Sequence, residues 1–184
     1  MAITAIEYWL ISRLAQAGLL PQAPHVLECG DNYWYGDIPL EKFGLDIYRV
    51  IPDPDARKRH VLELDGIAQT PSSSTLFELP RLFYRVFLGY ASLTSIDLGG
   101  SGGAAKVDLN WPVQADRTFD VTINFGTAQH VFNIHQFFKT MHDLTAPGGL
   151  MLHGMPFTGG PDDGFYNVQP TFYWDLASPT ATRC

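Results

Sequence analysis

The second half of the chain alternates short apolar runs with an amphipathic segment, and this alternation limits the fold more than any other feature. Residues 92–97, 119–124 and 150–153 have the length and composition of buried strands. Between the last two runs, residues 133–144 carry an apolar face at helical spacing, formed by Ile134, Phe137, Phe138 and Met141. Strands that alternate with helices form a mostly parallel sheet covered on both faces. We therefore predict a three-layer, Rossmann-like α/β fold.

The first half is less regular, and we interpret the whole chain, 1–184, as a single domain. Residues 3–20 have helical spacing, and residues 25–30 resemble a short buried strand that runs into a turn. Prolines and a serine run punctuate residues 37–75, which predicts an insertion with short elements and a candidate lid. A helix is expected to follow, with Pro80 placing its start near Leu79.

Composition and charge exclude several classes of protein. The net charge is −7, with 12 Lys and Arg against 19 Asp and Glu, which disfavours a nucleic-acid partner. The two cysteines, Cys29 and Cys184, offer neither a disulfide framework nor zinc spacing, so we expect a reduced, cytoplasmic protein. Four histidines between His130 and His153 lie near one another without an HExxH motif, and we predict no metal. No apolar run is long enough to cross a membrane.

Polar residues and glycines follow four of the expected strands. They occur at Glu28-Cys29-Gly30-Asp31, at Asp97, at Asp108 and at Asn124-Phe125-Gly126. In an open parallel sheet, ligands bind at the carboxyl ends of the strands near the point where the strand order reverses. A carboxylate there can accept protons from both ribose hydroxyls, as we expect for Asp97. Asp108 could accept from an adenine amino group, with Leu109 packed on the ring. The residues themselves therefore predict a nucleoside site.

Two further segments carry a resemblance to a known family. The run from Phe119-Asp120 to His130, followed by a helix and then Pro147-Gly148-Gly149 before an apolar run, resembles the fourth and fifth strands of class I S-adenosylmethionine-dependent methyltransferases. In that family an "FD" pair opens the fourth strand and "PGG" precedes the fifth. Residues 164–177 resemble the segment after the fifth strand in one bacterial branch. The resemblance covers roughly residues 26–31 and 92–177.

The resemblance implies a cofactor, S-adenosylmethionine, and a small-molecule or glycan-like methyl acceptor. It implies that the first loop holds the methionine part of the cofactor, that the second strand end holds the ribose and the third the adenine, and that the fourth lies near the methyl group. The residues implied for the methionine part are Glu28, Gly30 and Asp31, and those for the ribose are Asp97 and Leu98. Asp108 and Leu109 are implied for the adenine, and Asn124, Phe125 and Gly126 for the region near the methyl group. His130 follows the fourth strand and is the candidate catalytic base.

Three departures from the family pattern support an alternative, a non-catalytic or decayed Rossmann-like nucleotide-binding module. The first loop has Asn32 and Trp34 where the family has glycines. Asp97 lies far beyond the usual ~20 residues after that loop, a spacing that Asp46 fits better. The residues after Phe157 show no pattern for the family's closing antiparallel hairpin. A bare edge strand would then need a cover, for which we expect a homo-oligomer.

Overall fold

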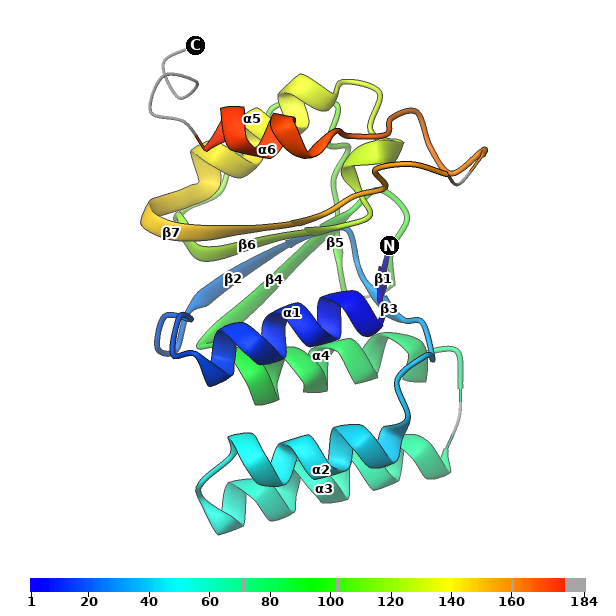
Figure 1. The fold of residues 1–184 in the computed structure, drawn as a ribbon, viewed down its shortest axis with the longest axis vertical. Helices are drawn as coiled ribbons and strands as arrows, with labels where there is room; N and C mark the ends of the chain where they lie inside the picture. Colours follow the sequence, from blue (N-terminus) through cyan, green and yellow to red (C-terminus); the bar gives the residue numbers. More distant parts are fainter. Residues whose placement is uncertain (71, 102, 160, 178–184) are drawn as a thin grey trace.

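The computed structural model describes residues 1–70, 72–101, 103–159 and 161–177, so Cys184 and the rest of the tail after residue 177 lie outside the described part. It shows an α/β protein with a five-stranded parallel sheet flanked by helices, compatible with a Rossmann-like fold (Figure 1). Helices α1 (Ala5–Gln16) and α4 (Thr75–Leu88) cover one face of this sheet. Helices α5 (Ile134–Leu144) and α6 (Pro170–Leu176) cover the other.

The sheet has the strand order β5-β4-β2-β6-β7, and every neighbouring pair is parallel. Its strands are β2 (His25–Cys29), β4 (Ser92–Asp97), β5 (Ala105–Lys106), β6 (Phe119–Phe125) and β7 (Thr145–Gly154). The chain starts in the middle at β2, moves outward to β5, and then crosses back to β6. The strand order therefore reverses between β2 and β6, which is where an open α/β sheet forms its ligand crevice.

A second, two-stranded sheet lies beside the start of α1. Strand β1 (Ala2–Ile3) pairs in parallel with β3 (Tyr33–Trp34). Because residue 3 belongs to this strand, the first helix starts later than its spacing predicts, with Thr4 as the N-cap and Glu7 completing a capping box. The start expected near Leu79 for the helix after the insertion is also wrong, since α4 begins at Thr75 and contains Pro80.

The expected irregular insertion over residues 37–75 is instead mostly helical. It forms α2 (Leu40–Val50) and α3 (Pro54–Gln69), which pack on the side of α4 that faces away from the sheet (Figure 1). The prolines stand at the helix starts, where a backbone N–H is not needed: Pro39 is the N-cap of α2 and Pro54 opens α3. The described part of the insertion is therefore an additional packed layer and does not form the expected lid.

An aromatic cluster joins this added layer to the sheet-covering helices. Tyr8 of α1 stacks on Phe83 of α4 at 5.0 Å between ring centroids, and Trp34 stacks on Phe43 of α2 at 5.6 Å. Trp34 is buried in this core. Trp34, which stands where the methyltransferase family has a glycine, therefore has a packing role in this protein.

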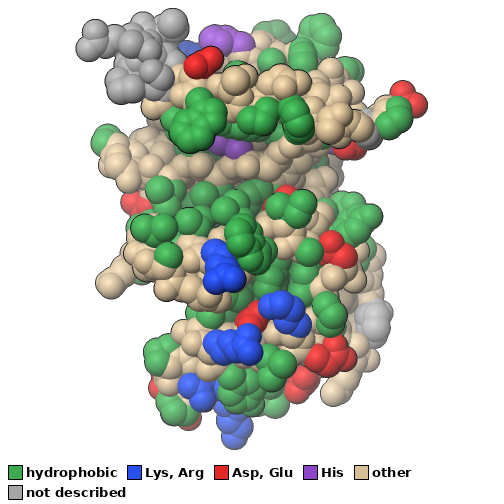
Figure 2. Space-filling model, in the orientation of Figure 1, with side chains coloured by type: hydrophobic (Ala, Val, Ile, Leu, Met, Phe, Trp, Pro, Cys, Tyr) green, Lys and Arg blue, Asp and Glu red, His purple; other side chains and the backbone are tan. Residues whose placement is uncertain are grey.

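An apolar groove of about 340 Å³ follows the outer edge of β7. It is lined by Leu10, Met151, Leu152, His153, Tyr173, Leu176 and Ala177. Hydrophobic side chains gather over α1 and α6 on either side of it (Figure 2). No antiparallel strand joins this sheet among the described residues. A second copy of the chain that covers the edge stays a prediction.

Asp46 lies inside α2 and accepts hydrogen bonds from one side chain of α1 and two side chains of α2. It accepts a hydrogen bond from the Tyr8 hydroxyl at 2.8 Å and from Arg49 at 3.0 Å, and Lys42 also donates to it. Burial alone would raise the pKa of Asp46, but the hydrogen bonds from Lys42 and Tyr8 lower it below its usual value. Asp46 therefore ties the insertion to α1, and both of its carboxylate oxygens have partners within the protein.

We expect Asp46→Asn to destabilise the fold at pH 7 by about 2 kcal/mol, because hydrogen bonds to a buried charge are lost. A lowered pKa adds stability above the pKa of the unfolded chain, so the difference from wild type should shrink as pH falls below about 4. Urea unfolding at several pH values measures this. Asp143→Asn, which removes an exposed partner of Lys139, is the matched control and should change stability by less than about 0.5 kcal/mol. Equal effects of the two substitutions would contradict the interpretation.

Candidate functional site

A pocket of about 160 Å³ opens at the carboxyl ends of β4 and β5 and beside the turn after β6. Its lining residues are Met1, Asp97, Leu98, Val107, Asp108, Leu109, Asn110, Thr127, His130 and Val131. Half of these were predicted from the sequence as ligand-binding or catalytic. Segments far apart in the chain thus meet at one place, as the parallel topology requires.

A wider hollow of about 440 Å³ adjoins this pocket, with Asp108 and Asn110 in both walls. Trp111 and Phe132 line it and are 68% and 73% exposed. The amide N–H of Asn133 donates to Asn110 Oδ1 at 2.9 Å, which ties the two loops of the rim together. Exposed aromatic rings beside polar groups suit a planar or ring-shaped ligand.

Asp108 is the half-buried carboxylate shared by the pocket and the hollow. Its Oδ1 accepts from the backbone N–H of Asn110 at 3.0 Å and from the Asn110 side chain at 2.7 Å. These two hydrogen bonds lower the pKa of Asp108, and the bond from the backbone has the larger effect. Both bonds go to the same oxygen, and the Trp111 side chain also contributes a hydrogen bond to this carboxylate. A ligand could use the acceptor capacity that remains on Oδ2. The geometry is that of a charged acceptor held in a fixed turn.

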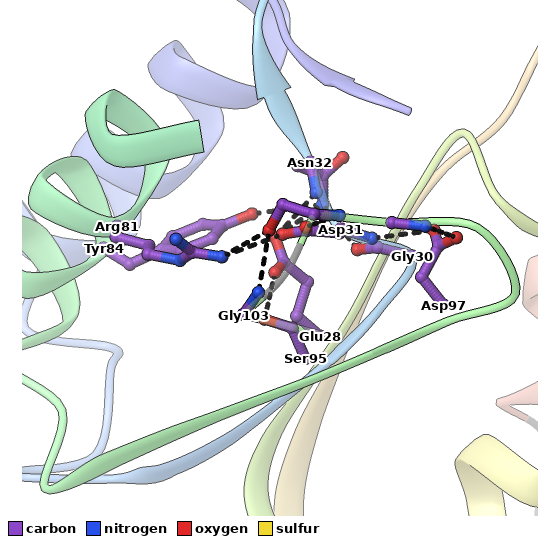
Figure 3. Close-up of polar contacts among 11 residues, drawn as sticks. Glu28, Gly30, Asp31, Asn32, Arg81, Tyr84, Ser95, Asp97 and Gly103 are labelled. Atoms are coloured by element: carbon purple, nitrogen blue, oxygen red, sulfur yellow. Dashed lines mark hydrogen bonds and ion pairs between the residues drawn. The ribbon is translucent and has the colours of Figure 1, made fainter. Parts of the chain in front are cut away.

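Glu28 of β2 is only 2% exposed and lies close to Ser95 and Asn32 (Figure 3). Its Oε2 accepts from the Ser95 hydroxyl at 2.6 Å, and its Oε1 accepts from the Asn32 side chain at 2.8 Å. Burial raises the pKa of Glu28 to about 7, against the opposing effect of these hydrogen bonds. Glu28 thus joins β2, β4 and the first loop from inside the protein.

Asp31 and Asp97 hold the glycine-rich loop that follows β4 (Figure 3). Asp97 Oδ1 accepts from the backbone N–H groups of Gly99 and Gly100, each at 2.7 Å, and its Oδ2 accepts from Asp31 N at 3.0 Å. Asp31 Oδ2 accepts from Ser101 N at 2.7 Å, and Arg81 of α4 donates to the Ser101 hydroxyl at 2.9 Å. The carboxylate oxygens of Asp31 and Asp97, which were predicted to bind a cofactor, therefore mostly accept hydrogen bonds from the protein itself. Asp97 Oδ2 can still accept one more hydrogen bond.

Gly30 stands where β2 meets the turn after β6. It has φ of +93°, and a Cβ atom at this position would lie 2.0 Å from Thr127 Oγ1. The Thr127 hydroxyl donates to the carbonyl of Cys29 at 2.6 Å. The glycine is therefore required by the protein's own packing, whether or not a ligand approaches it.

The three residues predicted to lie near the methyl group, at the end of β6 and directly after it, have different environments. Asn124 is buried, and its Oδ1 accepts from the backbone N–H groups of Thr127 and Ala128 at 3.2 and 3.1 Å. Phe125 packs into the core. Gly126, with φ of +80°, faces Met1, whose Cα would lie 3.7 Å from a Cβ atom at this position. Of these three residues, only Gly126 lies beside Met1.

His130 ends a short 3₁₀ helix, η1 (Ala128–His130), and its exposed side chain lines the pocket. Sequence reasoning missed Met1, Trp111 and Phe132. The last two follow predicted site residues by two or three positions, which is the one signal that pointed to them.

The chain matches no known family, no curated protein and no solved structure. In the part of the chain that the structure describes, no group of His, Cys, Asp or Glu side chains is arranged to hold a metal ion. Within the same part, no helix has the length and apolar character needed to span a bilayer.

We expect Glu28→Gln to change how stability depends on pH. Folded protein keeps the Glu28 proton up to about pH 7, whereas the unfolded chain loses it near pH 4.5, so this residue lowers stability as pH rises through that window. Glutamine keeps the acceptor for Asn32 and does not titrate. The variant should gain about 3 kcal/mol relative to wild type between pH 4.5 and 7, measured by chemical unfolding. A pH-independent difference would show that Glu28 is ionised in the folded protein throughout.

Proposed function

We propose that this chain binds S-adenosylmethionine at the carboxyl edge of the sheet and transfers its methyl group to a small-molecule or glycan-like acceptor. The observation that supports this most is the meeting of Asp97, Asp108, Leu109 and His130 in one pocket beside the reversal of strand order. Ligands of open α/β sheets bind at this place. The resemblance of residues 119–153 to the methyltransferase family adds the choice of cofactor.

The adenosine end of the cofactor fits the residues present. Asp108 Oδ2 would accept from the adenine amino group, Leu109 would pack on the ring, and Asp97 Oδ2 would accept one ribose hydroxyl. At 160 Å³ the pocket is smaller than the ~300 Å³ of small ligand sites, so the adjoining hollow must hold part of the ligand. The methionine end does not fit beside Gly30 and Gly126, because Met1 lies there.

The protein's own contribution would be binding, alignment and exclusion of water. The cofactor supplies the electrophilic methyl group. A base is needed only for an acceptor that carries a proton at neutral pH, and His130 would accept that proton from a group bound in the pocket.

A second candidate function is a nucleotide-binding module without catalysis. Two observations favour it: Met1 fills the methionine end of the crevice, and the glycine-rich loop engages Asp31 and Asp97. Formation of S-adenosylhomocysteine from S-adenosylmethionine, followed by mass spectrometry with mixtures of small molecules and glycans, separates the two. Turnover supports the enzyme, whereas binding of adenosine without turnover of the cofactor supports the module.

We expect adenosine and S-adenosylhomocysteine to bind, and Asp108→Asn to weaken adenosine at least about tenfold, because a charged acceptor becomes neutral. Asparagine keeps the oxygen that holds Asn110, so the turn should persist. Isothermal calorimetry measures both ligands. Asp116→Asn, an exposed residue outside the pocket lining, is the control and should bind as wild type does. Absence of binding by the wild-type chain would overturn the proposed function.

A further inference from the structure

We propose that residues 1–3 act as a strap that occupies the methionine end of the crevice and must leave before a full cofactor can bind. This inference rests on the proposed function, since it concerns the same crevice. It goes further, because it makes an N-terminal segment of this chain a competitor of its own ligand. The strap means Met1 together with β1 (Ala2–Ile3).

The strap lies across the place where the strand order reverses. A Cβ atom at Gly30, after β2, would lie 3.0 Å from Met1 Cγ, and one at Gly126, after β6, would lie 3.7 Å from Met1 Cα. Met1 also forms part of the wall of the 160 Å³ pocket. One residue therefore contacts both sides of the crevice and closes the end of the adenosine pocket.

A short strand pairing, two flanking backbone hydrogen bonds and one buried side chain hold the strap in place. The N–H of Tyr33 donates to the carbonyl of Met1 at 3.3 Å, and the N–H of Tyr35 donates to the carbonyl of Ile3 at 3.1 Å. The Ile3 side chain is fully buried in the core beside α1. A pair of two-residue strands is marginally stable by itself, so Ile3 is the main anchor.

The strap can move without unfolding the helix that follows it. Thr4 caps α1: its hydroxyl accepts from Ile6 N at 3.2 Å, and its own N–H donates to Glu7 at 3.0 Å. These bonds begin after residue 3, so the helix keeps its start when β1 separates from β3. The boundary between strap and helix is therefore a natural hinge.

This arrangement distinguishes two ligands that share the adenosine group. Adenosine needs only the pocket beside Asp97 and Asp108, and it can bind with the strap in place. S-adenosylhomocysteine also needs the space of Met1, so its apparent affinity is reduced by the fraction of molecules in which the strap is closed. Loosening the strap should raise the affinity for the second ligand alone.

The test compares Ile3→Ala with Ile11→Ala, because both isoleucines are fully buried in the same core and only Ile3 belongs to the strap. By calorimetry, Ile3→Ala should bind S-adenosylhomocysteine about fivefold more tightly or better than wild type and Ile11→Ala do. Adenosine should bind all three equally. Should the alanine variants fail to fold, Ile3→Val and Ile11→Val form the milder pair, with the same order expected.

Three outcomes overturn the inference. Unchanged affinity of the Ile3 variants for S-adenosylhomocysteine, or an equal gain in the Ile11 variants, shows that the strap does not compete. If adenosine still binds in either of these two cases, the strap is contradicted but the proposed function is not. Absence of binding of either ligand to any variant removes the proposed function and the strap together.

Hydrogen exchange at the amide of Tyr35 gives a second, independent measurement. This amide donates to Ile3, so it should exchange faster in wild-type protein saturated with S-adenosylhomocysteine and keep its rate with adenosine. The intact mass confirms that residue 1 is retained in the sample. An unchanged or slower rate with S-adenosylhomocysteine would contradict displacement of the strap.

Discussion

The close contact between the end of β2 and the turn after β6 is the constraint on which the crevice depends. Gly30 leaves room for Thr127, whose hydroxyl holds the carbonyl of Cys29 at 2.6 Å, and Gly30 N donates to the carbonyl of Ile96 at 2.7 Å. Three strands are thereby joined at the point where the strand order reverses. The pocket residues at the end of β4, after β5 and in η1 lie close to this junction.

Carboxylates around the junction divide into two groups with different tasks. Glu28, Asp31 and Asp97 are buried and take up backbone and side-chain donors of their own loops, which makes the crevice floor rigid before a ligand arrives. Asp108 stands at the rim beside exposed Trp111, and its second oxygen keeps acceptor capacity. Recognition of a ligand would therefore depend on the rim, while the floor provides the shape.

Much of the fold could be predicted because it follows from periodicity and topology. The strands over 92–97 and 119–125 and the helix over 134–144 have clear apolar patterns, and parallel strands bring their carboxyl ends together. Helices α2 and α3 were missed because prolines that open a helix resemble prolines that interrupt one. Trp34 in the core and Met1 across the crevice were missed because a two-residue strand leaves no pattern. The carboxylate partners depend on loop conformation, which spacing does not encode.

Backbone amide chemical shifts during a titration with adenosine report where a nucleoside binds, and they need no substitution in the protein. We expect the amides of Leu98, Leu109, Asn110 and His130 to shift together and to saturate with one affinity. Amides along the groove at β7 and α6, such as those of Leu152 and Leu176, should remain in place. Shifts confined to that groove, or no shifts at saturating adenosine, would contradict a nucleoside site at the reversal of strand order.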